Sequence, residues 1–308
     1  MKMYLRFILA LILTKIKSFL PDSSKVNERL NHLLIILIGS NHSRRLDNLK
    51  KIIKNRPLYD YELINFEYFS PINNYKRISI FVGDSHSEFY GRNFNLNSNK
   101  NKKNLFLTYH TGPTLLSTFG TSSQLIKRIY NFIIFIKNYN LNKTSSLNII
   151  FSLGEIDIRN FYYQVLKLDK SFKNEKILTK FIVNSFLKNF LNLQNMLKKN
   201  KIKKVKFFFK DITPTTYKKS YNPKTIKDLE KIRKNNPFPI IGELRKRIHW
   251  RKILSNQIKN KCRSQNIKFI ELNNENFNKN GCLNKLKTFD NGHISDLKLL
   301  SDVQLKVF

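Results

Sequence analysis

Five short apolar segments, separated by longer segments with helical spacing, constrain the fold of this chain most strongly. The short segments are rich in β-branched and aromatic residues and span 77–82, 105–109, 147–153, 205–209 and 267–272. Apolar residues recur at helical spacing over 125–139, 172–197, 243–262 and 296–305. Strands that alternate with helices of this length predict a parallel sheet with helices on both faces. We therefore expect an α/β fold: a three-layer α/β/α domain with a five-stranded parallel sheet.

The first 75 residues precede the first predicted strand and hold no recognisable chemistry. Apolar residues recur there at helical spacing over 4–20, and Pro21 ends the pattern. This pattern predicts an amphipathic helix that either packs on the rest of the chain or contacts a membrane surface. Its apolar run at 7–13 is too short to span a bilayer. We expect a partly helical N-terminal extension over 1–75 and one main domain over 76–308.

The chain is strongly basic, with 57 Lys and Arg against 21 Asp and Glu and a net charge of +36. Such a balance is typical of proteins that bind nucleic acid or anionic membranes. Here the lysines are spread along the whole chain, and neither zinc-finger spacing nor an RNA-recognition signature occurs. We therefore do not favour nucleic-acid binding, and we interpret the basic stretch 243–263 as a solvated outer face. Acidic glycans and anionic lipids remain alternative partners.

Only two cysteines occur, Cys262 and Cys282, and they form no Cys-x-x-Cys pair. Two cysteines do not make a disulfide framework, which mildly favours a reduced, cytoplasmic environment, although one bridge between them stays open. With the amphipathic segment 4–20, the sequence predicts a cytoplasmic protein with a peripheral membrane contact as an alternative.

Small and polar residues follow the first three predicted strands. Gly83-Asp84-Ser85 follows the first strand, Gly112 the second, and Gly154-Glu155-Ile156-Asp157 the third. In open parallel sheets, the working residues lie just beyond the carboxyl ends of the strands. This placement predicts a functional site at that edge of the sheet.

Ser85 is the candidate nucleophile of this site. Acyl transfer by a serine needs a base to take the hydroxyl proton and an acid to orient the base. His293 is the candidate base, because Asp290 precedes it by three residues and can reach its Nδ1 within one turn. His86 and His110 lie beside strand ends and are candidates for lining the pocket.

These blocks resemble those of the SGNH (GDSL-like) hydrolase family. Gly83-Asp84-Ser85 matches the first block, and Asp290 and His293 match the terminal Asp-x-x-His. Gly112 matches the glycine of the second block, and Gly154 and Asp157 match the ends of the third, Gly-x-Asn-Asp. The resemblance covers about residues 75–308. It implies a flavodoxin-like strand order, a triad of Ser85, Asp290 and His293, an oxyanion site at the amides of Ser85 and Gly112, and no metal or organic cofactor.

The third block departs from the family at Ile156, which stands where the family has an asparagine that donates to the oxyanion. Loss of one such donor costs about 100- to 1000-fold in rate. Arg159 is a candidate cationic substitute, and Glu155 is a candidate hydrogen-bond acceptor. The string Gly-Glu-Ile-Asp-x-Arg resembles a variant of SGNH-like proteins associated with bacterial surface-polysaccharide genes.

Three hypotheses for function follow. The first is a serine esterase or O-acyltransferase that acts on an acylated carbohydrate or a related small-molecule ester. The second, motivated by Ile156, is a non-catalytic SGNH-fold protein of surface-polysaccharide assembly. The third is a basic membrane-binding or nucleic-acid-binding protein, which requires binding with a steep salt dependence.

Overall fold

The structure of the chain is a computed structural model. The residues that the structure describes are 76–83, 85–90, 104–110, 115, 126, 129–130, 133, 146–215, 220–236, 239–272, 277–278, 280–283 and 297–307. The predicted N-terminal extension over 1–75, with its amphipathic segment, lies outside these residues.

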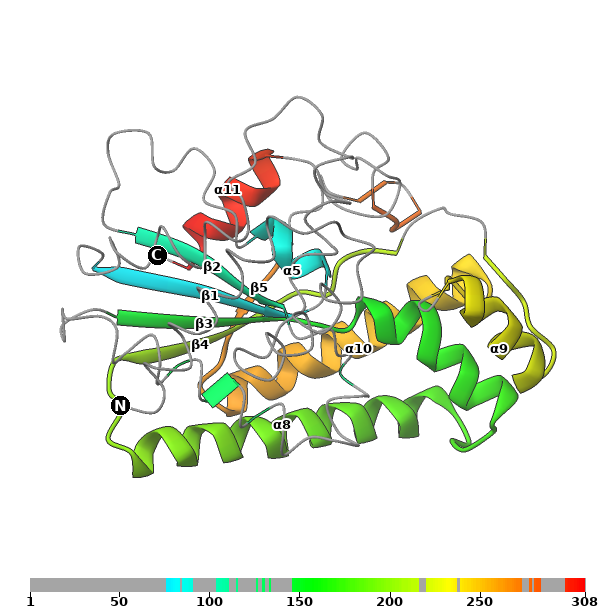
Figure 1. Ribbon diagram of the computed structural model, residues 1–308, viewed down its shortest axis with the longest axis horizontal. Helices are drawn as coiled ribbons and strands as arrows, with labels where there is room; N and C mark the ends of the chain where they lie inside the picture. Colours follow the sequence, from blue (N-terminus) through cyan, green and yellow to red (C-terminus); the bar gives the residue numbers. More distant parts are fainter. Residues whose placement is uncertain are drawn as a thin grey trace, which may run out of the picture.

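The core of the fold is a five-stranded parallel sheet (Figure 1). Its strands are β1 (Arg77–Gly83), β2 (Asn104–His110), β3 (Ser146–Ser152), β4 (Val205–Lys210) and β5 (Lys268–Ile270), in the spatial order β2-β1-β3-β4-β5. The predicted α/β fold with a parallel sheet is confirmed. The last strand is shorter than the predicted segment 267–272. All five strands run in the same direction. We call the end of the sheet where the strands terminate the carboxyl edge, and the opposite end, where they begin, the amino edge.

Both faces of the sheet are buried, which explains why its strands are predominantly apolar. Alternate side chains of one strand enter two separate cores. Ile80 and Ile149 face one core, and their neighbours Phe81 and Ile150 face the other. All four side chains are fully buried, so β1 and β3 each contribute to both layers of packing.

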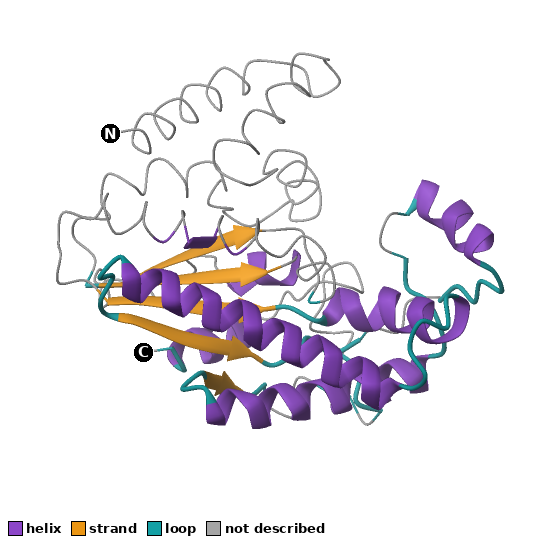
Figure 2. Ribbon diagram, turned by 90° about the horizontal axis from the view of Figure 1, so that it is seen from below, coloured by secondary structure: helices purple, strands orange, loops and turns teal. Residues whose placement is uncertain are grey.

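Two long helices cover one face, and two shorter helices cover the other (Figures 1 and 2). α8 (Glu175–Lys199) and α10 (Leu244–Ser264) pack together on the first core. α5 (Ser85–Tyr90) and α11 (Leu297–Leu305) enclose the second core. No helix in the described ranges is long and apolar enough to cross a membrane.

Polar caps fix where two of the helices begin. Asn174 accepts a hydrogen bond from the Ile177 amide (3.0 Å) and starts α8. Thr225 and Asp228 form a reciprocal capping box at the start of α9 (Ile226–Asn235), a helix that the apolar pattern does not predict. Only Leu229 of α9 is buried, so little apolar periodicity marks it in the sequence.

The prediction that 243–263 forms a solvated outer face is wrong for one side of α10. Arg247 is 1% exposed and Arg251 is 7% exposed, beside the buried Trp250, Leu254 and Ile258. The spacing of four residues places both arginines on the inner side of the helix. Their charges are satisfied by groups on distant segments of the chain, which the local pattern does not reveal.

Cys262 and Cys282 are both buried and are not joined by a disulfide. Burial raises the pKa of the Cys262 thiol to about 12. A thiol with such a raised pKa carries little thiolate and is inert, so Cys262 acts as a small apolar core residue.

Candidate functional site

Gly83 ends β1 and brings the first motif block against β3. It pairs in register with Ser152, the last residue of β3. A Cβ at Gly83 would clash with the Ser152 carbonyl group and lie 3.0 Å from Cβ of Ser87. A side chain is therefore excluded where the chain turns from β1 into α5, which begins at Ser85.

Gly154 plays the corresponding part at the end of β3. Its φ of +108° is a conformation that other residues rarely adopt. An added Cβ would lie 3.1 Å from the Ile212 side chain and 3.2 Å from that of Leu115. The chain turns here into a helical segment that contains two π-helical stretches, Asp157–Phe161 and Gln164–Leu168. Such wide helical turns are rare in proteins, and where they occur they often lie at functional sites.

The carboxylate of Glu155 links the first block to the third. Its Oε2 lies 3.2 Å from Nε2 of His86 and 3.3 Å from Nε of Arg159, both within ion-pair distance. The side chains of His86 and Glu155 are only 2% and 7% exposed, whereas that of Arg159 is 16% exposed. His86 follows Ser85 directly, so this buried contact anchors the start of α5 against the end of β3.

Asp157 links the third block to the loop after β2. Its carboxylate Oδ2 accepts a hydrogen bond from the backbone amide of Leu115 at 2.7 Å, and its side chain is fully buried. Leu115 lies three residues after Gly112, the residue that matches the family's second block. The arrangement makes Asp157 a positioning residue for that loop, because it has no surface to offer a substrate.

Ile156 is 2% exposed and belongs to the apolar core. An apolar side chain has no hydrogen bond to donate, so this side chain cannot replace the family's asparagine as an oxyanion donor. Arg159 keeps partial exposure three residues later, which is the property that a substrate-contacting donor requires.

The structure brings four of the predicted site residues together: His86, Gly154, Glu155 and Arg159, with Asp157 behind them. The remaining candidates, Asp84, Gly112, Asp290 and His293, lie outside the described residues, as does His110's side chain. Ser85 is described as the first residue of α5. In the described ranges, no group of three His, Cys, Asp or Glu side chains is placed to hold a metal ion.

Arg247 of α10 adds a buried cation behind this edge. Its Nε donates to Thr215 Oγ1 at 3.2 Å, and its Nη1 donates to the carbonyl oxygen of Gly242. Burial lowers the pKa of the guanidinium, and the negative charge of Glu155 opposes that shift. The carboxylate of Glu155 therefore lies within ion-pair distance of Arg159 and also acts electrostatically on the buried Arg247.

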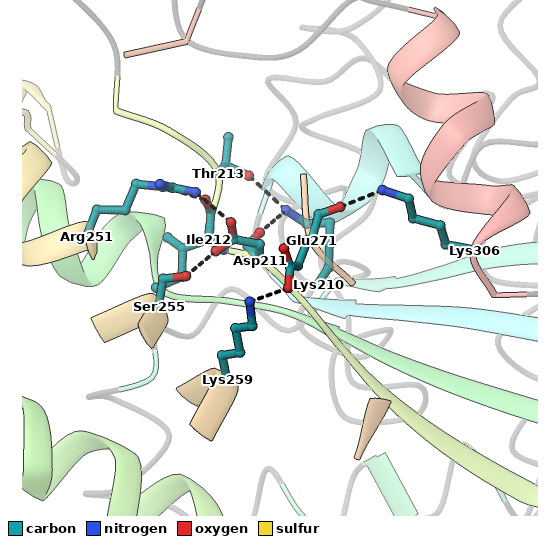
Figure 3. Close-up of polar contacts among 9 residues, drawn as sticks. All are labelled: Lys210, Asp211, Ile212, Thr213, Arg251, Ser255, Lys259, Glu271 and Lys306. Atoms are coloured by element: carbon teal, nitrogen blue, oxygen red, sulfur yellow. Dashed lines mark hydrogen bonds and ion pairs between the residues drawn. The ribbon is translucent and has the colours of Figure 1, made fainter. Parts of the chain in front are cut away.

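A second polar cluster follows β4 at the same edge (Figure 3). Asp211 Oδ2 accepts from Arg251 Nη2 at 2.8 Å, and its Oδ1 accepts from Ser255 Oγ at 2.5 Å. Arg251 Nε also donates to the carbonyl oxygen of Ile212 at 2.8 Å. Burial lowers the pKa of Arg251, and Asp211 opposes the shift. The cluster fixes α10 to the end of β4.

A pocket of about 520 Å³ opens beside this cluster. Its lining includes Asp211, Arg251 and Ser255, the ion pair of Lys259 with Glu271, and the rings of Phe269 and Phe277. The guanidinium of Arg251 lies 4.7 Å from the centre of the Phe277 ring. The pocket thus combines fixed donors and acceptors with two aromatic rings at the carboxyl edge.

Sequence reasoning missed Arg247, Arg251 and Ser255. A signal was available, since the three occur at intervals of four residues along the same side of α10 as Trp250, Leu254 and Ile258. Polar residues in register with an apolar stripe are buried with it, and buried polar groups need partners.

Comparisons with known proteins gave structural similarities only. No protein-family model matches the sequence, and no curated protein matches it. A candidate platelet activating factor from Streptococcus pneumonia shares 16% identity, with a TM-score of 0.44, over 85% of this chain and 98% of that one.

Two further solved structures are similar to a comparable degree. A candidate acylhydrolase from Bacteroides fragilis shares 14% identity, with a TM-score of 0.42, over 79% of this chain and 95% of that one. A GDSL-like lipase from Bacteroides thetaiotaomicron shares 15% identity, with a TM-score of 0.38, over 79% and 94%. At such values the fold of this chain is better described by its own strand order and register.

Proposed function

We propose that this chain is a serine-dependent ester hydrolase or O-acyltransferase whose site lies at the carboxyl edge of the sheet. The observation that carries the proposal is the contact of Glu155 with His86 and Arg159, which joins two motif blocks directly beside the start of α5 at Ser85. Asp157 ties the loop of the second block to the same point. If Ser85 were only a helix cap, the buried contacts that join the start of α5, the segment after β3 and the loop after β2 would not be needed.

In the proposed reaction, Ser85 Oγ attacks the acyl carbon, and its proton passes to Nε2 of His293. Asp290 orients the imidazole. The tetrahedral intermediate then expels the alcohol, which takes the proton from His293, and an acyl-serine is left. In the second half, His293 takes a proton from water or an acceptor hydroxyl as that oxygen attacks the acyl carbon. The bond to Ser85 Oγ then breaks, His293 returns the proton to Ser85 Oγ, and the acid or the new ester leaves. The amides of Ser85 and Gly112, with Arg159, stabilise the oxyanion.

The position of α11 supports a role for the terminal Asp290 and His293. The side chain of Gln304 donates to the Tyr90 carbonyl oxygen at 3.1 Å, which ties α11 to α5. α11 begins at Leu297, four residues after His293. The terminal motif thus comes directly before a helix that packs beside α5, and this order along the chain supports Asp290 and His293 as members of the proposed triad.

The pocket beside Asp211 supports a polar, polyhydroxylated alcohol part for the ester. Fixed hydrogen-bond donors and acceptors can orient the hydroxyl groups of a bound ligand, and the rings of Phe269 and Phe277 offer flat apolar surfaces for its carbon atoms. An acylated carbohydrate carries both kinds of surface. We therefore place acetylated sugars first among the substrates to be tested.

An assay with short p-nitrophenyl esters and acetylated monosaccharides tests the proposed function. We expect time-dependent release of the acyl group, in proportion to enzyme concentration, with higher kcat/KM for the sugar esters. Absence of turnover with every ester and every sugar acceptor would contradict the proposal and favour the non-catalytic alternative, for which the buried Ile156 is the specific observation.

A further inference from the structure

The amino edge of the sheet carries a dense cationic surface that the proposed function does not use. Two connections form it, from α8 into β4 and from α10 into β5, and their segments 195–207 and 260–269 contain no Asp or Glu. Figure 1 shows both helices ending at this edge, where the strands begin. Lys201, Lys203, Lys206 and Lys268 are all exposed there. We call these four the amino-edge lysines.

Helix stability accounts for only part of this charge. Basic residues in the last turn of a helix interact favourably with its dipole. Lys198 and Lys199 in α8, and Lys261 and Arg263 in α10, have that position. The amino-edge lysines lie beyond the helices, in the connection after α8 and in the strands β4 and β5. At these positions a helix dipole does not stabilise their positive charge.

Two of the amino-edge lysines, Lys206 and Lys268, line a pocket of about 390 Å³, and Lys198 and Lys204 line it as well. Its apolar floor includes Leu197, Ile202 and Val205. No acidic residue lines this pocket within the described part of the chain. Lys206 and Lys268 lie on the neighbouring strands β4 and β5, two positions apart in register, because Lys268 pairs with Phe208. A bound anionic surface offsets the repulsion between such closely spaced like charges.

We propose that the amino edge docks onto an anionic lipid bilayer. Lysines suit this partner because their stems cover apolar surface while their ammonium groups reach the headgroups. Each lysine near an anionic leaflet increases the affinity for the membrane about fivefold. Nucleic acid fits less well, because single strands need exposed aromatic rings for stacking. Among the described residues that line the pocket, the aromatic one is Phe207, which is only 8% exposed.

This docking would hold the proposed catalytic edge away from the bilayer. β1 has seven residues and rises by roughly 3.3 Å per residue, so the two edges lie about 20 Å apart. That exceeds the screening length of about 8 Å at physiological salt. A docked molecule would present its carboxyl edge to solvent, and the amino-edge lysines would not influence hydrolysis of a soluble ester.

Sedimentation of the full chain with vesicles tests this inference, using phosphatidylcholine alone or mixed with phosphatidylserine. We expect binding to the mixed vesicles only, and its loss as salt rises from about 0.1 to 1 M. A variant with all four amino-edge lysines changed to Gln should bind more than about tenfold more weakly. The matched control changes four exposed lysines around α9 to Gln: Lys224, Lys227, Lys231 and Lys234. It removes the same charge far from the amino edge (Figure 1) and should bind within about twofold of the parent.

Three outcomes would overturn the inference. The first is that the amino-edge variant, shown by circular dichroism to be folded, binds the mixed vesicles as tightly as the parent does. The second is that both variants lose binding equally, which would indicate diffuse attraction by net charge. The third is that the parent binds a duplex DNA more tightly than the vesicles and the amino-edge variant loses that binding. Vesicle binding is measured without any ester, so failure here is distinct from failure of the proposed enzymatic activity.

Discussion

Ser85→Ala is expected to lower ester hydrolysis at least about a thousandfold, because it removes the atom that forms the acyl intermediate. The loss should appear in kcat, with little change in KM, since the rest of the site is untouched. Steady-state kinetics with the best ester substrate measure it. The fold should be retained, because the change removes one oxygen atom at the start of a short helix.

Ser87→Ala is the matched control for this change. Ser87 lies two residues further along α5, and its side chain is fully buried, out of reach of substrate. We expect this variant to lose stability modestly, by about 1 kcal/mol, and to keep its activity within a few fold. Equal losses of kcat in both variants would mean that α5 matters only as a structural element.

Asp211→Ala is expected to lower the free energy of unfolding by about 3–5 kcal/mol, the largest stability effect we anticipate. It removes the acceptor of Arg251 and Ser255, and the Arg251 side chain is only 9% exposed. A buried guanidinium without its carboxylate cannot recover the hydration it lost on folding. Urea denaturation, followed by circular dichroism, measures the change.

Glu243→Ala is the control for the Asp211 variant. Glu243 also pairs with a cation of α10, Lys246, at 2.9 Å, but the side chains are 63% and 43% exposed. Solvent screens such a pair, so the loss should stay below about 1 kcal/mol. If Asp211→Ala lowered the free energy of unfolding no more than Glu243→Ala does, the buried pair of Asp211 with Arg251 would contribute no more to stability than an exposed pair. The double variant Asp211→Ala with Arg251→Met should recover part of the loss.

Much of the fold could be predicted from the sequence because its strands are buried on both faces. A doubly buried strand is mostly apolar, so Phe81 and Val82 mark β1, and Ile149 and Ile150 mark β3, without any knowledge of their partners. α9 could not be found in this way, because it buries only Leu229 and depends on the capping box of Thr225. Local patterns reveal elements that bury a stripe or a face, and they miss elements that do not.

The candidate site was predictable only to the level of its motif blocks. The sequence placed Ser85, Glu155 and Asp157 at strand ends, because glycine follows the apolar run in each case. It did not reveal that Glu155 faces His86, since 69 positions separate the two along the chain and no local rule connects them. It also misassigned Arg251, whose acceptor Asp211 lies 40 residues away. Polar contacts between distant segments require the fold to be known.

Labelling with a serine-directed fluorophosphonate, followed by peptide mapping by mass spectrometry, tests most directly the claim that Ser85 is the nucleophile of a working site. The account predicts one adduct per chain, on the peptide that contains Ser85, and none on the folded Ser85→Ala variant. A folded, unlabelled parent chain, or an adduct at another serine that persists in the Ser85→Ala variant, would contradict it.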